Sequence, residues 1–412
     1  MRRAAVQVAV LSWLGIVASP PVAAQVFDAP TLEELGVRYV SPEGFVQVKP
    51  SVRIELDGFV PQDAPAWHLE DTSPFIAGRA SLFVDLFVGR RLFVSTELRL
   101  DRGQPAVSGP LRGHVQQAFV RFTPKPGTNL HVQGGKFVSP FGGYPGRAHT
   151  TADPFIRPPL AYDHRTVMSA TEVPAAADGV FTWKDRPPFR AAGLPIVWAV
   201  PYPVGLTVSG GKGALTATGG VTTTAPSAEP SDWDTVDANT PAGPSAMGQI
   251  RYRVSPALQL GLSYTNGPYM RAGVSDPVTG TRVPRQDQEA YGIDATYSRG
   301  LVDIRGELLL NRWEVFRAPG TPRDVSYYVE GHTRIAAGLF IAARYNAIHF
   351  QELSRSNGQM DRWDYDRRRW QFGAGYRLGR SSEIRGEYMI NTTVDADDPR
   401  DNLLSLQWWF TF

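Results

Sequence analysis

The feature that most constrains the fold of this chain is an alternation of polar and apolar residues, which runs from Phe45 to the last residue in segments of about ten. In the final segment every second residue is apolar: Leu404, Leu406, Trp408, Phe410 and Phe412. Successive side chains of a β-strand point to opposite faces, so each segment predicts a strand with one apolar and one polar face. A similar pattern recurs along 302–311 and 383–391.

The connections between these segments alternate in length. Short turns, such as Gly89-Arg90 and Ser255-Pro256, alternate with long polar loops at 60–73, 102–111, 139–190, 223–242, 267–286, 314–323, 351–366 and 393–401. This layout is typical of an all-β transmembrane antiparallel barrel of about 16 strands, with short periplasmic turns and long extracellular loops. A soluble β-sandwich would bury the same apolar faces and is the alternative.

The N-terminus carries the pattern of an export signal. Residues 1–24 begin with Arg2 and Arg3, continue through an apolar run and end in Val22-Ala23-Ala24. This arrangement predicts a cleaved secretory signal peptide. We therefore expect a signal peptide at 1–24, a short periplasmic segment at 25–44 and a barrel at 45–412 in the cell outer membrane.

Composition excludes several kinds of function. The chain has no cysteine, so it has no disulfide or thiolate metal site. The 42 basic residues are nearly balanced by 40 acidic ones, which gives no reason to expect nucleic acid as a partner. Nearly all the positive charge is arginine, whose planar guanidinium suits carboxylates and phosphates, although codon usage in a GC-rich genome produces the same bias.

No sequence motif of an enzyme is present. The seven histidines show no HExxH spacing, and neither a GxSxG elbow nor a phosphate loop occurs. We expect no metal, no cofactor and no catalytic residue. A barrel hydrolase would need a histidine beside a serine nucleophile, for which His332 or His349 could serve, and this remains an alternative.

Charged residues fill the predicted inner face of strand after strand. The alternation points these arginines toward the pore: Arg53, Arg79, Arg99, Arg121, Arg305, Arg344, Arg377 and Arg385. Acids such as Glu55, Asp57, Glu307 and Glu387 share that face. Two interpretations are open, a transverse field that orients solutes or simply a hydrated wall of paired charges.

The third long loop is the candidate constriction. Residues 139–168 combine many prolines and glycines with charged and aromatic residues, of which we select Arg147, Asp153, Arg157, Tyr162, Asp163 and Arg165. Folded into the lumen, the loop would place opposed charges at an eyelet and set ion preference. The alternative is an ordinary extracellular loop.

A later stretch, 361–369, alternates acids, arginines and aromatic residues. We interpret it as a solvated loop without a site.

Two motifs resemble a known family. The C-terminal Trp408, Phe410 and Phe412 resemble the assembly signal of outer-membrane proteins, and the whole layout resembles bacterial porins. The segment Gly135-Lys136-Phe137-Val138-Ser139-Pro140-Phe141-Gly142 is similar to the strand that leads into the constriction of the phosphate-selective porin O and P family. In that family an arginine ladder and a lysine cluster select anions, and this chain has the arginines without a comparable lysine cluster.

The resemblance implies a passive diffusion channel for small hydrophilic solutes, with a preference for phosphate or other small anions. It also implies a homotrimer surrounded by membrane lipid and lipopolysaccharide and inserted by the barrel-assembly machinery. The alternatives are a barrel hydrolase and a structural or adhesion barrel with a closed lumen.

Overall fold

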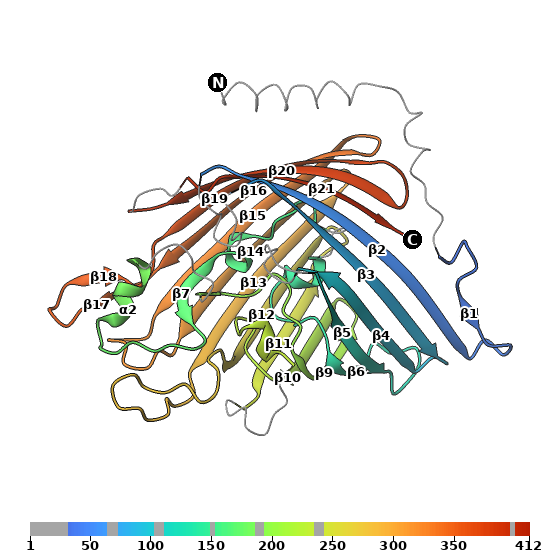
Figure 1. The fold of residues 1–412 in the computed structure, drawn as a ribbon. Helices are drawn as coiled ribbons and strands as arrows, with labels where there is room; N and C mark the ends of the chain where they lie inside the picture. The colour runs from blue at the N-terminus through green and yellow to red at the C-terminus, as the bar shows by residue number, and fades with distance from the viewer. Residues whose placement is uncertain are drawn as a thin grey trace, which may run out of the picture.

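The computed structural model describes residues 32–63, 73–102, 111–148, 153–185, 193–234, 243–395 and 400–412. Within these ranges sixteen antiparallel strands pair in a closed ring (Figure 1). They are β2 (Val46–Pro61), β3 (Phe75–Val88), β4 (Leu92–Asp101), β5 (Arg112–Phe122), β6 (His131–Lys136), β9 (Val204–Lys212), β10 (Leu215–Thr222), β11 (Ser245–Arg253), β12 (Leu258–Pro268), β13 (Asp287–Arg299), β14 (Val302–Trp313), β15 (Arg323–Ala336), β16 (Leu339–Phe350), β19 (Arg367–Arg377), β20 (Ser382–Thr393) and β21 (Leu403–Thr411).

The first and last barrel strands close the ring. β2 pairs with β3 on one side and with β21 on the other, in a register that runs from Arg53 opposite Thr411 to Pro61 opposite Leu403. Closure leaves no free strand edge, so the backbone hydrogen bonds of a membrane-spanning sheet are satisfied internally. The all-β prediction, the count of about sixteen strands and the alternation of short turns with long loops are confirmed.

The two faces of the barrel wall differ in chemistry. Large apolar side chains such as Leu56, Leu98 and Ile293 are exposed on the outside, whereas Glu55, Glu97 and other polar residues at alternate positions are buried inside. This is the arrangement of a wall with lipid outside and polar groups inside. None of the helices in the described ranges is long and apolar enough to cross a membrane.

Five short strands of the described residues lie outside the barrel wall, two of them in the connection between β6 and β9. β1 (Tyr39–Val40) extends the sheet along the start of β2, beyond the point where β21 ends. β17 (Glu352–Ser354) and β18 (Met360–Arg362) form a hairpin within the loop between β16 and β19. The predicted signal peptide at 1–24 falls outside the described residues.

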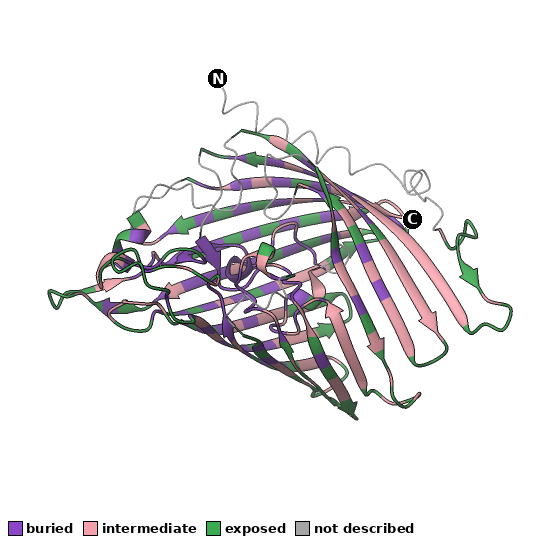
Figure 2. Ribbon diagram, turned by 60° about the horizontal axis from the view of Figure 1, so that its bottom comes forward, coloured by how far each residue is buried: buried purple, intermediate pink, exposed green. Residues whose placement is uncertain are grey.

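The connection between β6 and β9, here called the inner loop (137–203), accounts for most of the interior. It contains β7 (Arg165–Ser169), β8 (Gly193–Pro195), the short helix α2 (Gly179–Thr182), and the 3-10 turns η2 (Pro145–Arg147), η3 (Leu160–Tyr162) and η4 (Trp183–Asp185). Figure 2 shows its buried residues within the ring of strands. The sequence from Thr171 to Tyr202, which the alternation could not resolve, belongs to this loop, and its described parts, 171–185 and 193–202, add no strand to the barrel wall.

An apolar cluster joins the inner loop to one side of the wall. Loop residues such as Tyr162, Met168 and Phe181 pack with the inward-facing Leu309 and Trp313 of β14 and their neighbours on β15 and β16. Fully burying one such side chain contributes roughly 1.5–3 kcal/mol. The inner loop and this cluster therefore cover part of the inner face of the wall.

Candidate functional site: an arginine-lined pocket beside the inner loop

The strand that enters the inner loop turns inward at a glycine. Gly135 at the end of β6 has φ of 126°, and a Cβ there would collide with the backbone of Ala118 and Phe119 on β5. Only glycine combines this backbone conformation with such close packing. Phe137 follows with 2% exposure, so the chain leaves the wall at Lys136 and continues inside the barrel.

Polar side chains of the wall hold the backbone of the inner loop. Glu307 on β14 accepts hydrogen bonds from the Gly143 amide at 2.7 Å and from the Tyr162 hydroxyl at 2.8 Å. Glu387 on β20 accepts the amides of Ile156 at 2.6 Å and Arg157 at 2.8 Å. Carboxylates that accept N–H groups away from bulk water make stronger hydrogen bonds than neutral acceptors.

Buried ion pairs reinforce this attachment. The Arg344 guanidinium on β16 lies 2.8 Å from Glu330 on β15 and 3.1 Å from Asp153 of the loop. Arg369 on β19 lies 2.6 Å from Asp163 of the loop. The side chains of both arginines are 0–1% exposed, so the wall from β14 to β20 and the inner loop form one packed body.

The outer part of the inner loop is tied to the other long loops. Lys184 lies 2.6 Å from Asp361 of the β17–β18 hairpin, and the Tyr365 hydroxyl donates to Asp185 at 2.7 Å. The Arg271 amide in the loop after β12 donates to the Ala170 carbonyl at 2.8 Å. These contacts lie over the same side of the barrel as the apolar cluster.

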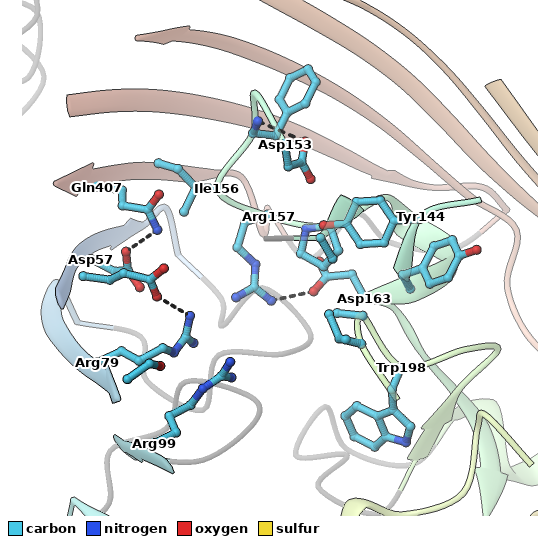
Figure 3. A pocket seen from close by; sticks show the side chains of 18 of the residues that line it. Asp57, Arg79, Arg99, Tyr144, Asp153, Ile156, Arg157, Asp163, Trp198 and Gln407 are labelled. Carbon is cyan, nitrogen blue, oxygen red and sulfur yellow. Dashed lines mark hydrogen bonds and ion pairs between the residues drawn. The ribbon is translucent and has the colours of Figure 1, made fainter. Parts of the chain in front are cut away.

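A pocket of about 150 Å³ remains between the inner loop and the opposite wall, formed by β2, β3, β4 and β21. Figure 3 shows Arg79, Arg99 and Arg157 projecting toward this space, with Trp198 at its edge. Five arginines line it: Arg53, Arg79, Arg99, Arg157 and Arg165. Four acids also line it: Glu55, Asp57, Asp153 and Asp163.

The wall arginines follow from strand register. Arg53 of β2 lies opposite Ser81 of β3, which lies opposite Arg99 of β4, and Glu55 lies opposite Arg79 in the adjacent row. Arg79 forms ion pairs with Glu55 at 2.8 Å and with Asp101 at 3.4 Å. Arg99 pairs with Glu97 at 2.6 Å.

The six residues selected for the constriction have different surroundings. Arg157, Arg165, Asp153, Asp163 and Tyr162 line the pocket, and Arg157 pairs with Asp163 at 2.5 Å. Arg147 is not among the lining residues. Its side chain instead points from the loop to β15, 2.9 Å from Glu330 and 3.1 Å from the Tyr328 hydroxyl, where it anchors the loop to the wall.

The eight selected wall arginines also divide. Arg53, Arg79 and Arg99 line the pocket. Arg344 and Arg385 point inward but are covered by the inner loop, and Arg385 donates to the carbonyl of Asp153. Arg305 lies 3.4 Å from Glu330, Arg121 donates to Gln133 on β6, and Arg377 is 59% exposed beside the short turn after β19.

The C-terminal aromatic residues form a row on the outer face of β21. The rings of Trp408 and Phe410 are 5.3 Å apart, and those of Phe410 and Phe412 are 4.9 Å apart. The Phe412 amide donates to the Val52 carbonyl at 2.8 Å. The last residue therefore takes part in closing the barrel.

Several site residues were missed from the sequence. Trp198 and Tyr202 line the pocket but lie in the stretch without clear alternation. Arg369 was placed in a solvated loop, which is wrong, because β19 begins at Arg367 and Arg369 pairs with buried Asp163. The sequence of β14 did indicate that the inner loop covers this part of the wall, because its inward positions Leu309 and Trp313 are apolar where a water-facing wall would be polar.

The described residues do not assemble a metal site. Within the described part of the chain no group of three or more His, Asp or Glu side chains is placed to hold a metal ion. His332 lies 3.4 Å from Asp303 and His349 lies 2.9 Å from Asp366. The described contacts of these two histidines include no serine hydroxyl.

Comparison with known proteins gives the fold. No protein-family model and no curated protein matches this sequence. Among solved structures, the chain is similar to the anion-selective porin from Comamonas acidovorans, at 13% identity and a TM-score of 0.57, over 89% of this chain and all of that one.

Two further solved structures agree. The outer membrane channel DcaP of Acinetobacter baumannii has 10% identity and a TM-score of 0.56, over 91% of this chain and 99% of that one. OmpT, an outer membrane protein of Vibrio cholerae, has 11% identity and a TM-score of 0.57, over 89% of this chain and 98% of that one. The chain thus has the barrel fold found in outer-membrane porins and channels.

Proposed function

We propose that this chain is an outer-membrane diffusion channel for small hydrophilic solutes, with a preference for small anions such as phosphate. The observation that carries the proposal is the arginine-lined pocket between the inner loop and the β2–β4 wall of a closed sixteen-stranded barrel. Rings of basic side chains in a pore raise the local concentration of anions. The porin fold of the similar structures supports a channel.

The setting of the channel is part of the same proposal. Residues 1–24 would direct export, 25–44 would lie in the periplasm and 45–412 would span the outer membrane beside lipopolysaccharide. The row that ends in Phe412 would be read by the barrel-assembly machinery. The protein would act as a homotrimer without a cofactor, and one form of OmpT from Vibrio cholerae is described as a trimer.

Phosphate is the more specific possibility within the anion class. The segment 135–142 resembles the phosphate-selective porin O and P family, and guanidinium groups bind phosphate oxygens in pairs. The pocket contains no lysine among its lining residues, unlike the lysine cluster of that family. Phosphate added to a chloride solution should reduce the chloride current if the pocket favours phosphate.

The test is swelling of liposomes that contain the refolded protein. In isosmotic arabinose we expect these liposomes to swell faster than protein-free liposomes, because the neutral sugar enters through the pore. Folded protein that gives no swelling above this control would contradict the channel.

A closed lumen is the second candidate, because one observation favours it. The apolar cluster fills the interior against β13 to β16, so a large part of the cross-section is occupied. The swelling assay separates the two, since a barrel with a closed lumen admits no arabinose.

A further inference from the structure

The charges of the pocket do not cancel locally. Asp153 and Asp163 face the pocket, but each is also paired with an arginine that lies behind the pocket wall, Arg344 at 3.1 Å and Arg369 at 2.6 Å. Part of their negative charge is therefore balanced from outside the pocket. The five lining arginines exceed the four lining acids by one positive charge. Arg79 and Arg99 are in turn paired with Asp101 and Glu97, which lie outside the lining.

Arg53 is the wall arginine best placed to receive an anion. The described residues give its Nε no hydrogen-bond partner, and its guanidinium packs over the Phe83 ring at 5.4 Å. Arg157 enters from the loop side, and its Nε also lacks a partner among the described residues. Both Nε atoms are buried, so a carboxylate bound between the two guanidinium groups would accept hydrogen bonds from their Nη atoms.

Apart from Ser81 and Gln407, the rest of the lining is apolar or aromatic. Eleven of the twenty-two lining residues are aromatic, aliphatic or proline, among them Phe59, Phe155, Trp198, Val200 and Tyr202. Arg165 packs over the Trp198 indole at 5.2 Å, and the indole N–H is directed away to the Ser227 carbonyl at 3.0 Å. The aromatic surfaces add a stacking contact for a flat ring, which an inorganic anion held by the same arginines does not make.

The size of the pocket fits one ring. Its volume is about 150 Å³, and a cavity on the order of 150 Å³ accommodates a benzene molecule. Its positive charge is carried by arginine alone, and guanidinium both pairs with a carboxylate through two N–H groups and stacks on aromatic rings.

We infer that this pocket binds small aromatic carboxylates, with the carboxylate between Arg53 and Arg157 and the ring against Trp198. The inference deepens the proposed function by naming a solute class, and it rests on that function for its role in transport. The binding itself does not require an open pore, so the two can be tested separately.

The test is equilibrium dialysis of radiolabelled benzoate against the refolded full-length protein in detergent, with protein-free micelles as the blank. Unlabelled benzoate should displace the label at a concentration about tenfold lower than acetate, which lacks the ring, or phosphate, because the ring adds a stacking contact. Benzyl alcohol, which has the ring without the charge, should displace it poorly.

Matched variants locate the site. Arg53→Lys keeps the charge but loses the planar fork, and we expect it to weaken benzoate binding about fivefold. Arg121→Lys, on the same inner face but outside the pocket, should leave binding unchanged. Trp198→Leu should remove the advantage of benzoate over acetate, and the heat-dependent shift of the barrel in gel electrophoresis checks that each variant is folded.

The possible outcomes are distinct. Equal displacement by benzoate and acetate, or stronger displacement by phosphate, would overturn the inference and leave the channel untouched. Equal losses in the Arg53 and Arg121 variants would also overturn it, because binding would not be located in the pocket. Specific benzoate binding without liposome swelling would support the site and contradict the channel.

Discussion

The Arg344 guanidinium on β16 lies 3.1 Å from the Asp153 carboxylate of the inner loop, 191 residues away in the sequence. Both side chains are nearly inaccessible to solvent, at 0% and 4% exposure. Arg344 also donates to Glu330 and to the Arg157 carbonyl, and it packs over the Phe155 ring at 4.0 Å. One wall residue thus fixes the part of the loop that carries Arg157 into the pocket.

Arg344→Met should release this part of the loop. Removing one partner of a buried ion pair costs about 3–5 kcal/mol, because the remaining charges of Glu330 and Asp153 stay buried without it. We expect larger and noisier single-channel currents. The control is Arg377→Met on the exposed end of β19. Equal currents in the Arg344 variant and the wild type would contradict the anchoring role.

Glu387→Ala should expose the loop backbone next to Arg157. The substitution removes the carboxylate that accepts the amides of Ile156 and Arg157, and each hydrogen bond to a charged group contributes about 1.5–3 kcal/mol. Chymotrypsin should then cleave after Phe155, at the bond whose Ile156 amide Glu387 accepts, at least tenfold faster than in the wild type, as measured by mass spectrometry. Glu387→Gln, which keeps one acceptor oxygen, should be intermediate, and unchanged cleavage in both variants would refute the role.

Alkaline pH should loosen the inner loop. Burial, followed by the charges of Glu307 and Asp153 respectively, raises the pKa of the Tyr162 and Tyr144 hydroxyls well above the ordinary value of about 10. Below a pH of about 10, the ordinary pKa of a released tyrosine, these hydroxyls stabilise the docked loop fully. As the pH rises further, the released tyrosines ionise more easily than the docked ones, so this stabilisation of docking is lost.

Single-channel conductance should therefore stay constant from pH 7 to about 9 and rise above about 10. Tyr162→Phe should weaken this dependence, whereas Tyr388→Phe on the lipid-facing side of β20 should not. A conductance independent of pH up to about 11 would show that these hydroxyls do not hold the loop.

Deletion of Phe412 should reduce assembly more than stability. Phe412 adds two backbone hydrogen bonds to Val52 and one ring contact to Phe410, a small part of the β2–β21 junction. We expect a several-fold lower yield in outer membranes of a Gram-negative host, with nearly normal refolding in detergent. Equal losses in both assays would mean that Phe412 acts through stability, not as an assembly signal.

The wall of this barrel was predictable because its environment imposes a strict period. Lipid on one face of each strand and polar groups on the other fix the alternation in segments such as 404–412. Because consecutive connections lie at opposite ends of the barrel, short turns at one end alternate along the chain with long loops at the other. Arg53, Arg79 and Arg99 were found among the pore-lining candidates for this reason.

The inner loop was not predictable in the same way, because its structure comes from contacts between distant residues. Periodicity gives Arg53 and Arg344 the same inward direction, yet Arg53 lines the pocket while Arg344 is covered by the loop. Only the packing of the loop decides between these environments. Trp198 follows the same rule, since no local pattern relates it to Arg165.

The most direct test of the central claim is single-channel recording of the refolded protein in a planar bilayer under a KCl gradient. We expect discrete conductance steps and a reversal potential whose sign shows that chloride is more permeant than potassium. This preference should be stronger at 0.1 M than at 1 M salt, because the Debye length falls from about 10 Å to about 3 Å. No steps from verified folded protein would contradict the channel, and a cation-selective reversal potential would contradict the arginine pocket as the determinant of selectivity.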